Sequence, residues 1–315
     1  MTGGGLVSVV TPCYNGEKYI GRFFDSVLSQ TYKEIEVVAI NDGSTDRTEQ
    51  VIQEYEKEFQ TRGIALIHRY QENAGQAAAL NNGLKLFTGE YLLWVDSDDE
   101  LSDTFIEERV TYLYNHPEKS YCYGKAVYVS EDNPDVVISE TKPRKYSGEH
   151  QFFEDIINVR DVFFSGYLCR TEALNRVIRN RDIFSGAGGQ NAQLLLPLAW
   201  YYGEPGYVDS SVYKYYVRAN SHSHSQNTNL KIIEQLERYE AILVETISRI
   251  QDEQARAYIP QIRKKYARLR FGNAVDTRDQ FIIRKHYSQL KKLGIVEFHD
   301  TLMLLKYSLP LYRKG

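Results

Sequence analysis

The sequence has few of the residues that mark the more specialised classes of protein. Among 315 residues there are 3 cysteines and 8 prolines, too few for a disulfide scaffold, a collagen or a proline-rich disordered chain. No apolar run approaches the roughly 18 residues that a membrane-spanning helix needs, and the first apolar segment lacks the basic flank and cleavage site of a signal peptide. We therefore expect a globular, cytoplasmic protein whose three cysteines are buried and reduced.

The charge is distributed unevenly along the chain. The formal net charge is −4, yet residues 255–315 carry 14 Lys and Arg against 4 Asp and Glu, a local net charge of +10. A basic tail on an acidic body is typical of chains that contact nucleic acid, an anionic membrane surface or a protein partner. A solvated helical face is the alternative, and composition alone does not choose among these.

Short apolar runs alternate with amphipathic stretches in the first 130 residues. The apolar runs predict strands at residues 6–11, 35–40, 64–68 and 91–95. Stretches with apolar residues three and four apart predict helices at residues 17–30, 46–59 and 75–87. The alternation predicts an α/β fold with a mostly parallel, doubly wound sheet flanked by helices, in which ligands bind beyond the carboxyl ends of the strands.

The pattern changes after the first 130 residues. Alternating Tyr and Val predict added strands or a hairpin at residues 121–140. Further elements are expected as helices near residues 151–159, 171–178 and 192–202 and a strand at 208–217. From Gln226 to the end every segment has a helical pattern, so we place a boundary there.

Two of the loops that follow predicted strands carry candidate functional residues. Asp42-Gly43-Ser44 is a weak signal, because turns capped in this way are common. Asp96-Ser97-Asp98-Asp99-Glu100 has four carboxylates in five residues, whose repulsion requires a cation or hydrogen-bond donors. Mg²⁺ and Mn²⁺ prefer oxygen ligands and keep coordination positions open for phosphates. The alternative is the solvated acidic start of a helix.

Four motifs in order carry a family resemblance. They are Thr11-Pro12-Cys13-Tyr14-Asn15, Asn41-Asp42-Gly43-Ser44-Thr45-Asp46, Asn73-Ala74-Gly75 with Asn81-Asn82-Gly83, and Gly89-Glu90-Tyr91 leading to Asp96-Ser97-Asp98-Asp99. Together they resemble the family 2 glycosyltransferases with a GT-A fold. The resemblance implies an inverting transfer of a sugar from a nucleoside-diphosphate donor, usually UDP-linked, to a hydroxyl, assisted by Mn²⁺ or Mg²⁺. It implies a catalytic domain at 1–225, with a nucleotide-binding half to about 130 and an acceptor half from 131, before a helical region at 226–315.

The resemblance also implies which residues bind the nucleotide. Thr11, Pro12 and Tyr14 would line the base pocket, with the Tyr14 ring against uracil. Asp42 would accept a hydrogen bond from the base imide, as an acceptor-only carboxylate can. The residues expected near the base and ribose are Asn73 and Gln76.

Metal and phosphate contacts are implied at the acidic loop, Asp96 to Asp99, and at the Ser-rich segment that begins at Arg218. Asp96 would face the ribose and the metal, and Asp98 would bind the metal directly. Arg218 can pair with phosphate oxygens, and His222 or His224 could complete the metal site through a neutral imidazole. A solvated loop is the alternative for this Ser-rich segment, and the sequence does not choose between the two histidines.

The acceptor side departs from the family pattern. Many relatives have a Glu-Asp pair after a glycine, and its Asp is the general base. Here Gln190 and Asn191 follow Gly189, and neither amide can take a proton at physiological pH. We expect both amides to contact the acceptor and Asp99 to lie near the donor sugar or acceptor, and we assign no base. The alternative is that Asn191 caps a helix.

These observations leave two main hypotheses. The first is a metal-dependent hexosyltransferase that uses a glycan or lipid-linked acceptor in surface polysaccharide or glycan biosynthesis, where the basic tail would contact the inner face of a membrane or a second copy of the chain. The second is a catalytically silent module that binds nucleotide sugar or glycan, which the Gln190-Asn191 pair motivates. A nucleotidyltransferase is disfavoured because the first loop is not glycine-rich and basic. Nucleic-acid binding ranks last, since the tail has no recognised motif for it.

Overall fold

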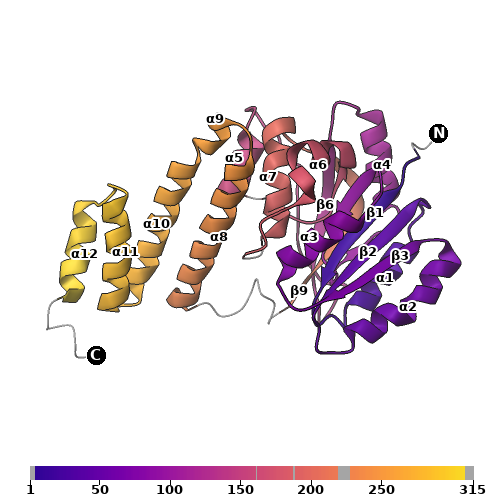
Figure 1. The fold of residues 1–315 in the computed structure, drawn as a ribbon, viewed down its shortest axis with the longest axis horizontal. Helices are drawn as coiled ribbons and strands as arrows, with labels where there is room; N and C mark the ends of the chain where they lie inside the picture. The colour runs from indigo at the N-terminus through magenta and orange to yellow at the C-terminus, as the bar shows by residue number, and fades with distance from the viewer. Residues whose placement is uncertain (1–3, 161, 187–188, 219–227, 309–315) are drawn as a thin grey trace. The chain divides into compact units, whose positions relative to one another are not determined.

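The chain forms two compact units. The computed structural model describes residues 4–160, 162–186, 189–218 and 228–308. Residues 1–221 form an α/β unit and residues 222–315 a second unit, whose described part is helical (Figure 1). The predicted fold class, a mostly parallel sheet flanked by helices with a helical C-terminal region, is confirmed.

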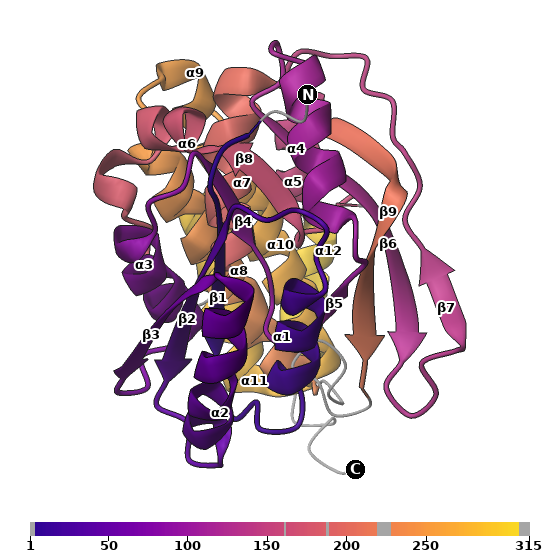
Figure 2. The ribbon, with the colours of Figure 1, turned by 90° about the vertical axis from the view of Figure 1, so that its right-hand side faces the viewer.

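The first unit is built on a single sheet. In the described residues it has nine strands in the order β3-β2-β1-β4-β8-β6-β9-β5, and β7 pairs with β6 at an outer edge (Figure 2). The strands are β1 (Val7–Cys13), β2 (Ile35–Asp42), β3 (Ala65–Gln71), β4 (Tyr91–Trp94), β5 (Glu100–Leu101), β6 (Tyr121–Ser130), β7 (Val137–Glu140), β8 (Tyr167–Arg170) and β9 (Gly206–Val217). The first four strands are parallel, as predicted, and β8 runs antiparallel to β4. The loops after β1, β2 and β4 therefore open at one edge of the sheet.

Helices cover both faces of the parallel part of the sheet. Val9 of β1 shares a buried cluster with Phe23 and Phe59, whereas a Cβ placed on Gly83 would lie only 2.6 Å from Cγ1 of Val10. The helices that carry these residues are α1 (Ile20–Leu28), α2 (Thr48–Arg62) and α3 (Gln76–Leu86). Successive strand residues point to opposite faces, so α1 and α2 cover one face and α3 the other. This double coverage explains the unbroken apolar runs of the strands.

The remaining elements of the first unit include two that the sequence did not predict. The further helices are α4 (Phe105–Asn115), α5 (Gln151–Asn158), α6 (Thr171–Val177) and α7 (Gln190–Tyr202), with a 3-10 turn, η1, at Arg179–Arg181. Neither α4 nor β8 was expected; β8 has only four residues, too few for a periodic pattern. The alternative that the acidic loop starts a helix is wrong, because the loop leads into β5 and α4 begins later, at Phe105.

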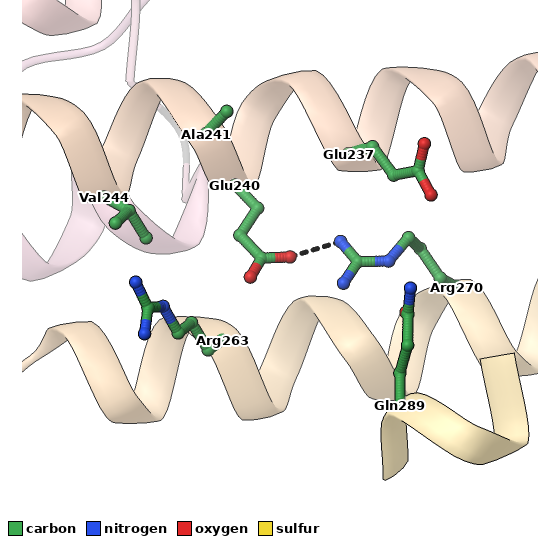
Figure 3. Close-up of a pocket in the computed structure, with 7 residues that line it drawn as sticks. All are labelled: Glu237, Glu240, Ala241, Val244, Arg263, Arg270 and Gln289. Carbon is green, nitrogen blue, oxygen red and sulfur yellow. Dashed lines mark hydrogen bonds and ion pairs between the residues drawn. The ribbon is translucent and has the colours of Figure 1, made fainter. Parts of the chain in front are cut away.

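The described part of the second unit is a series of consecutive helices. Its described helices are α8 (Asn229–Arg249), α9 (Glu253–Arg256), α10 (Ile259–Asp276), α11 (Gln280–Lys292) and α12 (Phe298–Ser308). A cavity of about 290 Å³ lies between α8 and α10 and is lined by Glu237, Glu240, Ala241, Val244, Arg263, Arg270 and Gln289 (Figure 3). The buried Arg270 forms an ion pair with Glu240 there. This ion pair ties the two long helices together.

Two expectations about the chain as a whole can be compared with the structure. Cys13, Cys122 and Cys169 are free and buried, as predicted, and burial raises the pKa of the Cys13 and Cys122 thiols to about 12. They are therefore unreactive packing residues. Among the described residues, no helix is both long and apolar enough to span a membrane.

Candidate functional site

Hydrogen bonds join the loops that follow β1 and β2. The backbone N–H of Asn15 donates to Ser44 Oγ at 2.9 Å, and Asn15 Oδ1 accepts from the backbone N–H of Thr45 at 2.8 Å. Asn15 has a left-handed backbone with φ of 49°, which Asn tolerates better than most residues. Tyr14, beside it, is 50% exposed. The ring of Tyr14 is thus free to stack on a planar ligand at the edge of the sheet.

Thr11 and Pro12 lie inside β1 rather than in an open pocket. Thr11 is 0% exposed, and its Oγ1 has no hydrogen-bond partner among the described residues. Pro12 is also buried. Of the three residues expected to line a base pocket, only Tyr14 presents its side chain to solvent in this structure.

Asp42 braces the loop between β3 and α3. It is 2% exposed, its Oδ1 accepts from Gln71 Nε2 at 2.7 Å and Ala74 N at 2.9 Å, and its Oδ2 accepts from Gly75 N at 2.9 Å. A carboxylate offers about four acceptor positions, and these hydrogen bonds use three of them. The sequence suggested a base contact or a capped turn, and it did not predict this bracing of a distant loop.

The tight turn after Asp42 brings Asn73 close. Gly43 has φ of +70°, and a Cβ placed on it would lie 2.5 Å from Asn73 N. The Asn73 amide donates to the backbone oxygen of Asp42 at 3.0 Å. Gly43 is therefore required both by its left-handed backbone and by the close approach of the β3–α3 loop.

Asp96 is the central residue in a series of side-chain hydrogen bonds. Its Oδ1 accepts from Gln76 Nε2 at 3.0 Å and its Oδ2 from Ser165 Oγ at 2.7 Å. Burial, together with the nearby charge of Asp98, raises the pKa of Asp96 to about 6. Asn191 Nδ2 in turn donates to Ser165 Oγ at 3.3 Å. This series of hydrogen bonds, from Gln76 to Asn191, therefore connects the expected donor and acceptor sides.

Asp98 lies between two guanidinium groups. Its Oδ2 forms an ion pair with Arg218, and its backbone oxygen accepts from Arg22 Nη2 at 2.6 Å. Arg22 also pairs with Glu131 at 2.9 Å and lies 3.4 Å from the ring centroid of Tyr216. Two such cations beside an aspartate suit the oxygens of a diphosphate. Arg22 was missed, because an arginine on an amphipathic helix has no distinguishing sequence signal.

Asp99 faces the protein interior. It is 2% exposed, its Oδ2 accepts from the Tyr213 hydroxyl at 2.7 Å, and its Oδ1 accepts from Tyr216 N at 3.2 Å. Burial, with the charges of Asp98 and Asp96, holds the pKa of Asp99 well above its usual range. This placement fastens the acidic loop to β9, which gives Asp99 a framework role instead of the acceptor contact expected for it.

The residues at the start of α7 carry amides and no carboxylate. Gln190 is 6% exposed, and Gly189, with φ of 63°, occupies the cap position without a side-chain cap. The alternative that Asn191 caps this helix is therefore wrong. Its amide instead reaches Ser165, a 5% exposed residue just before β8. No motif marks Ser165, so the sequence could not point to it.

The carboxylates of Asp96 and Asp98 are compatible with binding a divalent cation. Among the described residues no cluster of three or more His, Cys, Asp and Glu side chains is arranged to hold a metal. Mg²⁺ is commonly bound by one or two carboxylates together with substrate phosphates and water. Asp98 and Asp96 supply that number and lie close enough for the charge of one to raise the pKa of the other. His222 and His224 lie outside the described residues.

Comparisons with known proteins agree with this picture. Residues 8–178 match the family model described as Glycosyl transferase family 2. A glycosyltransferase of Rickettsia typhi is 39% identical over 120 residues, and the glycosyltransferase GlyA of Streptococcus pneumoniae is 42% identical over 101 residues. These alignments cover 37% and 32% of this chain but only 36% and 14% of the relatives' own lengths.

Solved structures with the same fold extend over nearly the whole chain. TarS 1–349 of S. aureus, in complex with UDP-GlcNAc, has a TM-score of 0.57 at 18% identity, covering 96% of this chain and 89% of that one. The mannosyltransferase PcManGT of Pyrobaculum calidifontis, in complex with GDP-Man and Mn²⁺, has a TM-score of 0.55 at 16% identity and covers 98% and 81%. At these identities the likeness concerns the fold, which is that of GT-A proteins.

Proposed function

The chain belongs to glycosyl transferase family 2, and on that premise we propose that it moves a sugar from a nucleoside-diphosphate donor to a hydroxyl, with inversion at the sugar carbon. The observation that carries this proposal is Asp98 between Arg22 and Arg218 at the carboxyl edge of the parallel strands. An aspartate and two guanidinium groups together suit a bound diphosphate and its counter-ion.

The nucleotide would lie along the loops after β1 and β2. The exposed Tyr14 ring would stack on the base, and the fourth acceptor position of Asp42 would accept a hydrogen bond from the base imide N–H. Uracil has an imide N–H that can donate to this carboxylate, so we propose a UDP-sugar. Asn73, in the loop after β3, and Gln76, at the start of α3, would contact the base and ribose. Complexes of TarS with UDP-GlcNAc and PcManGT with GDP-Man support a nucleotide sugar as the donor.

Asp98 and Asp96 would hold Mn²⁺ or Mg²⁺. When bound, the ion neutralises charge on the departing diphosphate. Arg218 is paired with Asp98 in the structure, and its guanidinium could turn to the phosphate oxygens when a cation takes its place. Arg22, held between Glu131 and Tyr216, would supply a second, fixed positive charge.

The acceptor would bind beside α7. The amides of Gln190 and Asn191 can donate and accept hydrogen bonds with sugar hydroxyls, and Ser165 fixes the Asn191 amide. No general base is assigned, because neither amide can take a proton and Asp99 is buried. The same amides favour the second candidate, a module that binds nucleotide sugar without transferring it.

The wider role follows from the class of acceptor. We propose a hexosyltransferase that acts at the cytoplasmic face of a membrane on a glycan or lipid-linked acceptor, in surface polysaccharide or glycan biosynthesis. Self-association of the chain stays a prediction.

A donor-hydrolysis screen tests this proposal. Purified chain with Mn²⁺ is incubated with UDP-, GDP- and dTDP-sugars, and the released nucleotide is measured. We expect release from a UDP-sugar, its loss in EDTA, and faster release when an acceptor glycan is added. Tight nucleotide binding without hydrolysis or transfer across a wide acceptor panel would favour the silent module.

A further inference from the structure

The two outermost helices of the second unit present an unusual combination of surfaces. On α12, Phe298, Leu302 and Leu305 are 80%, 43% and 53% exposed. They are spaced four and three residues apart, so they lie on one face of the helix. Met303 and Leu304 pack against the core of the unit instead. The exposed stripe is therefore a second apolar face that nothing in the described structure covers.

The neighbouring helix α11 carries a basic face. Its exposed residues are Phe281, Arg284, Lys285, Ser288, Lys291 and Lys292. They fall on one side of the helix, with Ile283, His286 and Leu290 buried on the other. Phe281 at the end of this face is 83% exposed. Figure 1 shows α11 and α12 side by side, and Tyr287 of α11 lies 3.0 Å from Thr301 of α12 through their hydroxyls.

Three acidic residues near these helices, Asp279, Glu297 and Asp300, have hydrogen-bond or ion-pair partners within the unit. Asp300 is 4% exposed and pairs with Arg268 at 2.5 Å, and Glu297 pairs with the same arginine at 2.9 Å. Asp279 accepts the backbone N–H of Phe281 at 2.8 Å as the cap of α11. The α11 face therefore carries four basic side chains and no acidic one, with only Lys285 reaching an acidic partner, Glu237, at 3.4 Å in the described residues.

We propose that the α11–α12 surface, defined as Phe281, Arg284, Lys291 and Lys292 with Phe298, Leu302 and Leu305, binds an anionic lipid bilayer. Basic side chains are attracted to anionic headgroups, and exposed Phe and Leu can enter the headgroup boundary. A basic patch and inserted apolar side chains reinforce each other at an anionic surface. The apolar stripe argues against nucleic acid, whose backbone calls for polar and charged contacts. This inference does not depend on the glycosyl transfer proposed above.

Sedimentation with vesicles tests the proposal on the full chain. Vesicles of phosphatidylcholine alone are compared with vesicles that also contain phosphatidylglycerol, in low and high NaCl. We expect binding at least about tenfold tighter to the anionic vesicles at low salt, and its loss at high salt, because salt screens exposed charges. Equal binding to neutral and anionic vesicles, or no binding at low salt, would overturn the proposal.

Two variants separate the charge from the apolar stripe. Lys291→Glu with Lys292→Glu, and Phe298→Ser with Leu302→Ser and Leu305→Ser, should each weaken binding by about tenfold or more. The matched controls lie in the first unit: Lys142→Glu with Lys145→Glu, and Val137→Ser with Ile138→Ser, all at exposed positions. The controls should bind vesicles as the wild type does.

Four further readouts keep the outcome unambiguous. Thermal unfolding of each variant shows that the chain is folded, and UDP binding without vesicles should be unchanged in all of them. A failure of donor hydrolysis in every protein would count against the proposed function and leave the lipid result standing. If instead the wild type forms a dimer on size-exclusion chromatography that the triple Ser variant abolishes, the stripe belongs to a second copy and the lipid proposal is wrong.

Discussion

The donor side and the acceptor side of the candidate site are held in place in different ways. On the donor side, the loop after β1 is bonded to Ser44, and Asp42 accepts three hydrogen bonds from the region around α3. On the acceptor side, Asn191 reaches Asp96 through the single hydroxyl of Ser165. A hydrogen bond between neutral groups contributes about 0.5–1.5 kcal/mol and one to a charged group about 1.5–3 kcal/mol. The donor loops keep several such bonds when one is lost, so they tolerate the loss of one bond better.

This difference suggests how each side works. Several backbone hydrogen bonds give the donor loops a fixed shape before any ligand arrives, so binding costs little ordering entropy. The acceptor side depends on the direction of a few amide groups, which a small displacement would change. We therefore expect substitutions on the donor side to change nucleotide binding, and substitutions on the acceptor side to change turnover.

The largest expected effect is at Asp98. Asp98→Asn removes the charge that would hold the cation and that now pairs with Arg218, so turnover should fall by about a hundredfold or more. The rate of UDP release from a UDP-sugar in Mn²⁺ measures it. Asp132→Asn, an exposed position on the β6–β7 turn, is the matched control. Turnover near the wild-type rate in Asp98→Asn would show that Asp98 is not the metal ligand.

The second-largest effect is expected at Asp42, and the contacts of Asp42 in the structure decide which substitution tests it. Replacing Asp42 with Ala would leave Ala74 N and Gly75 N without their acceptor, at about 1–3 kcal/mol each, so a lowered Tm is expected whatever Asp42 binds. Asp42→Asn should weaken UDP by about ten- to a hundredfold through loss of one charged hydrogen bond. Inorganic diphosphate, which has no base, should bind as before. Equal losses for both ligands would make Asp42 a framework residue only.

For Ser165 we expect an effect on turnover and little effect on donor binding. Ser165→Ala removes the hydroxyl between Asp96 and Asn191, so kcat should fall by about tenfold, as for other residues that orient a metal ligand. The KM for the donor should change little. Ser147→Ala, at an exposed position of the same unit, is the control. A loss confined to KM, or none in kcat, would show that Ser165 does not position the acceptor side.

Asn191 should give a smaller and more specific effect. Asn191→Ala should reduce transfer to an acceptor more than it reduces donor hydrolysis, because the amide would contact the acceptor and not the nucleotide. Asn191→Asp restores a carboxylate near the acceptor and should keep or raise transfer. Both rates are measured in the same assay with and without acceptor. Parallel losses of the two rates would place Asn191 outside the acceptor contact.

Asp99 should show the smallest effect. In Asp99→Asn the amide oxygen can still accept from Tyr216 N, and the amide NH₂ can donate to the Tyr213 hydroxyl. Transfer and Tm should both stay within about twofold and a few degrees of the wild type. Loss of transfer with donor hydrolysis preserved would instead identify Asp99 as the missing base.

The sequence predicted the donor side better than the acceptor side, for physical reasons. Strands β1, β2 and β4 are buried on both faces and have unbroken apolar runs, so these strands and the loops after them could be located. Side chains brought together by the tertiary fold, such as Arg22 beside Asp98 and Ser165 beside Asp96, leave no periodic or local pattern. The burial of Asp99 depends on its pairing with β9, far along the chain, and no spacing rule could show it.

The central claim is that Asp98 helps to form a metal-dependent site for a nucleoside diphosphate. Calorimetric titration of UDP in Mn²⁺ and in EDTA, on the wild type and on Asp98→Asn, tests it most directly. We expect at least about tenfold tighter binding in Mn²⁺ for the wild type, equivalent to roughly 1.4 kcal/mol, and no such difference for Asp98→Asn. Equal affinity of the wild type for UDP with and without the metal would contradict it.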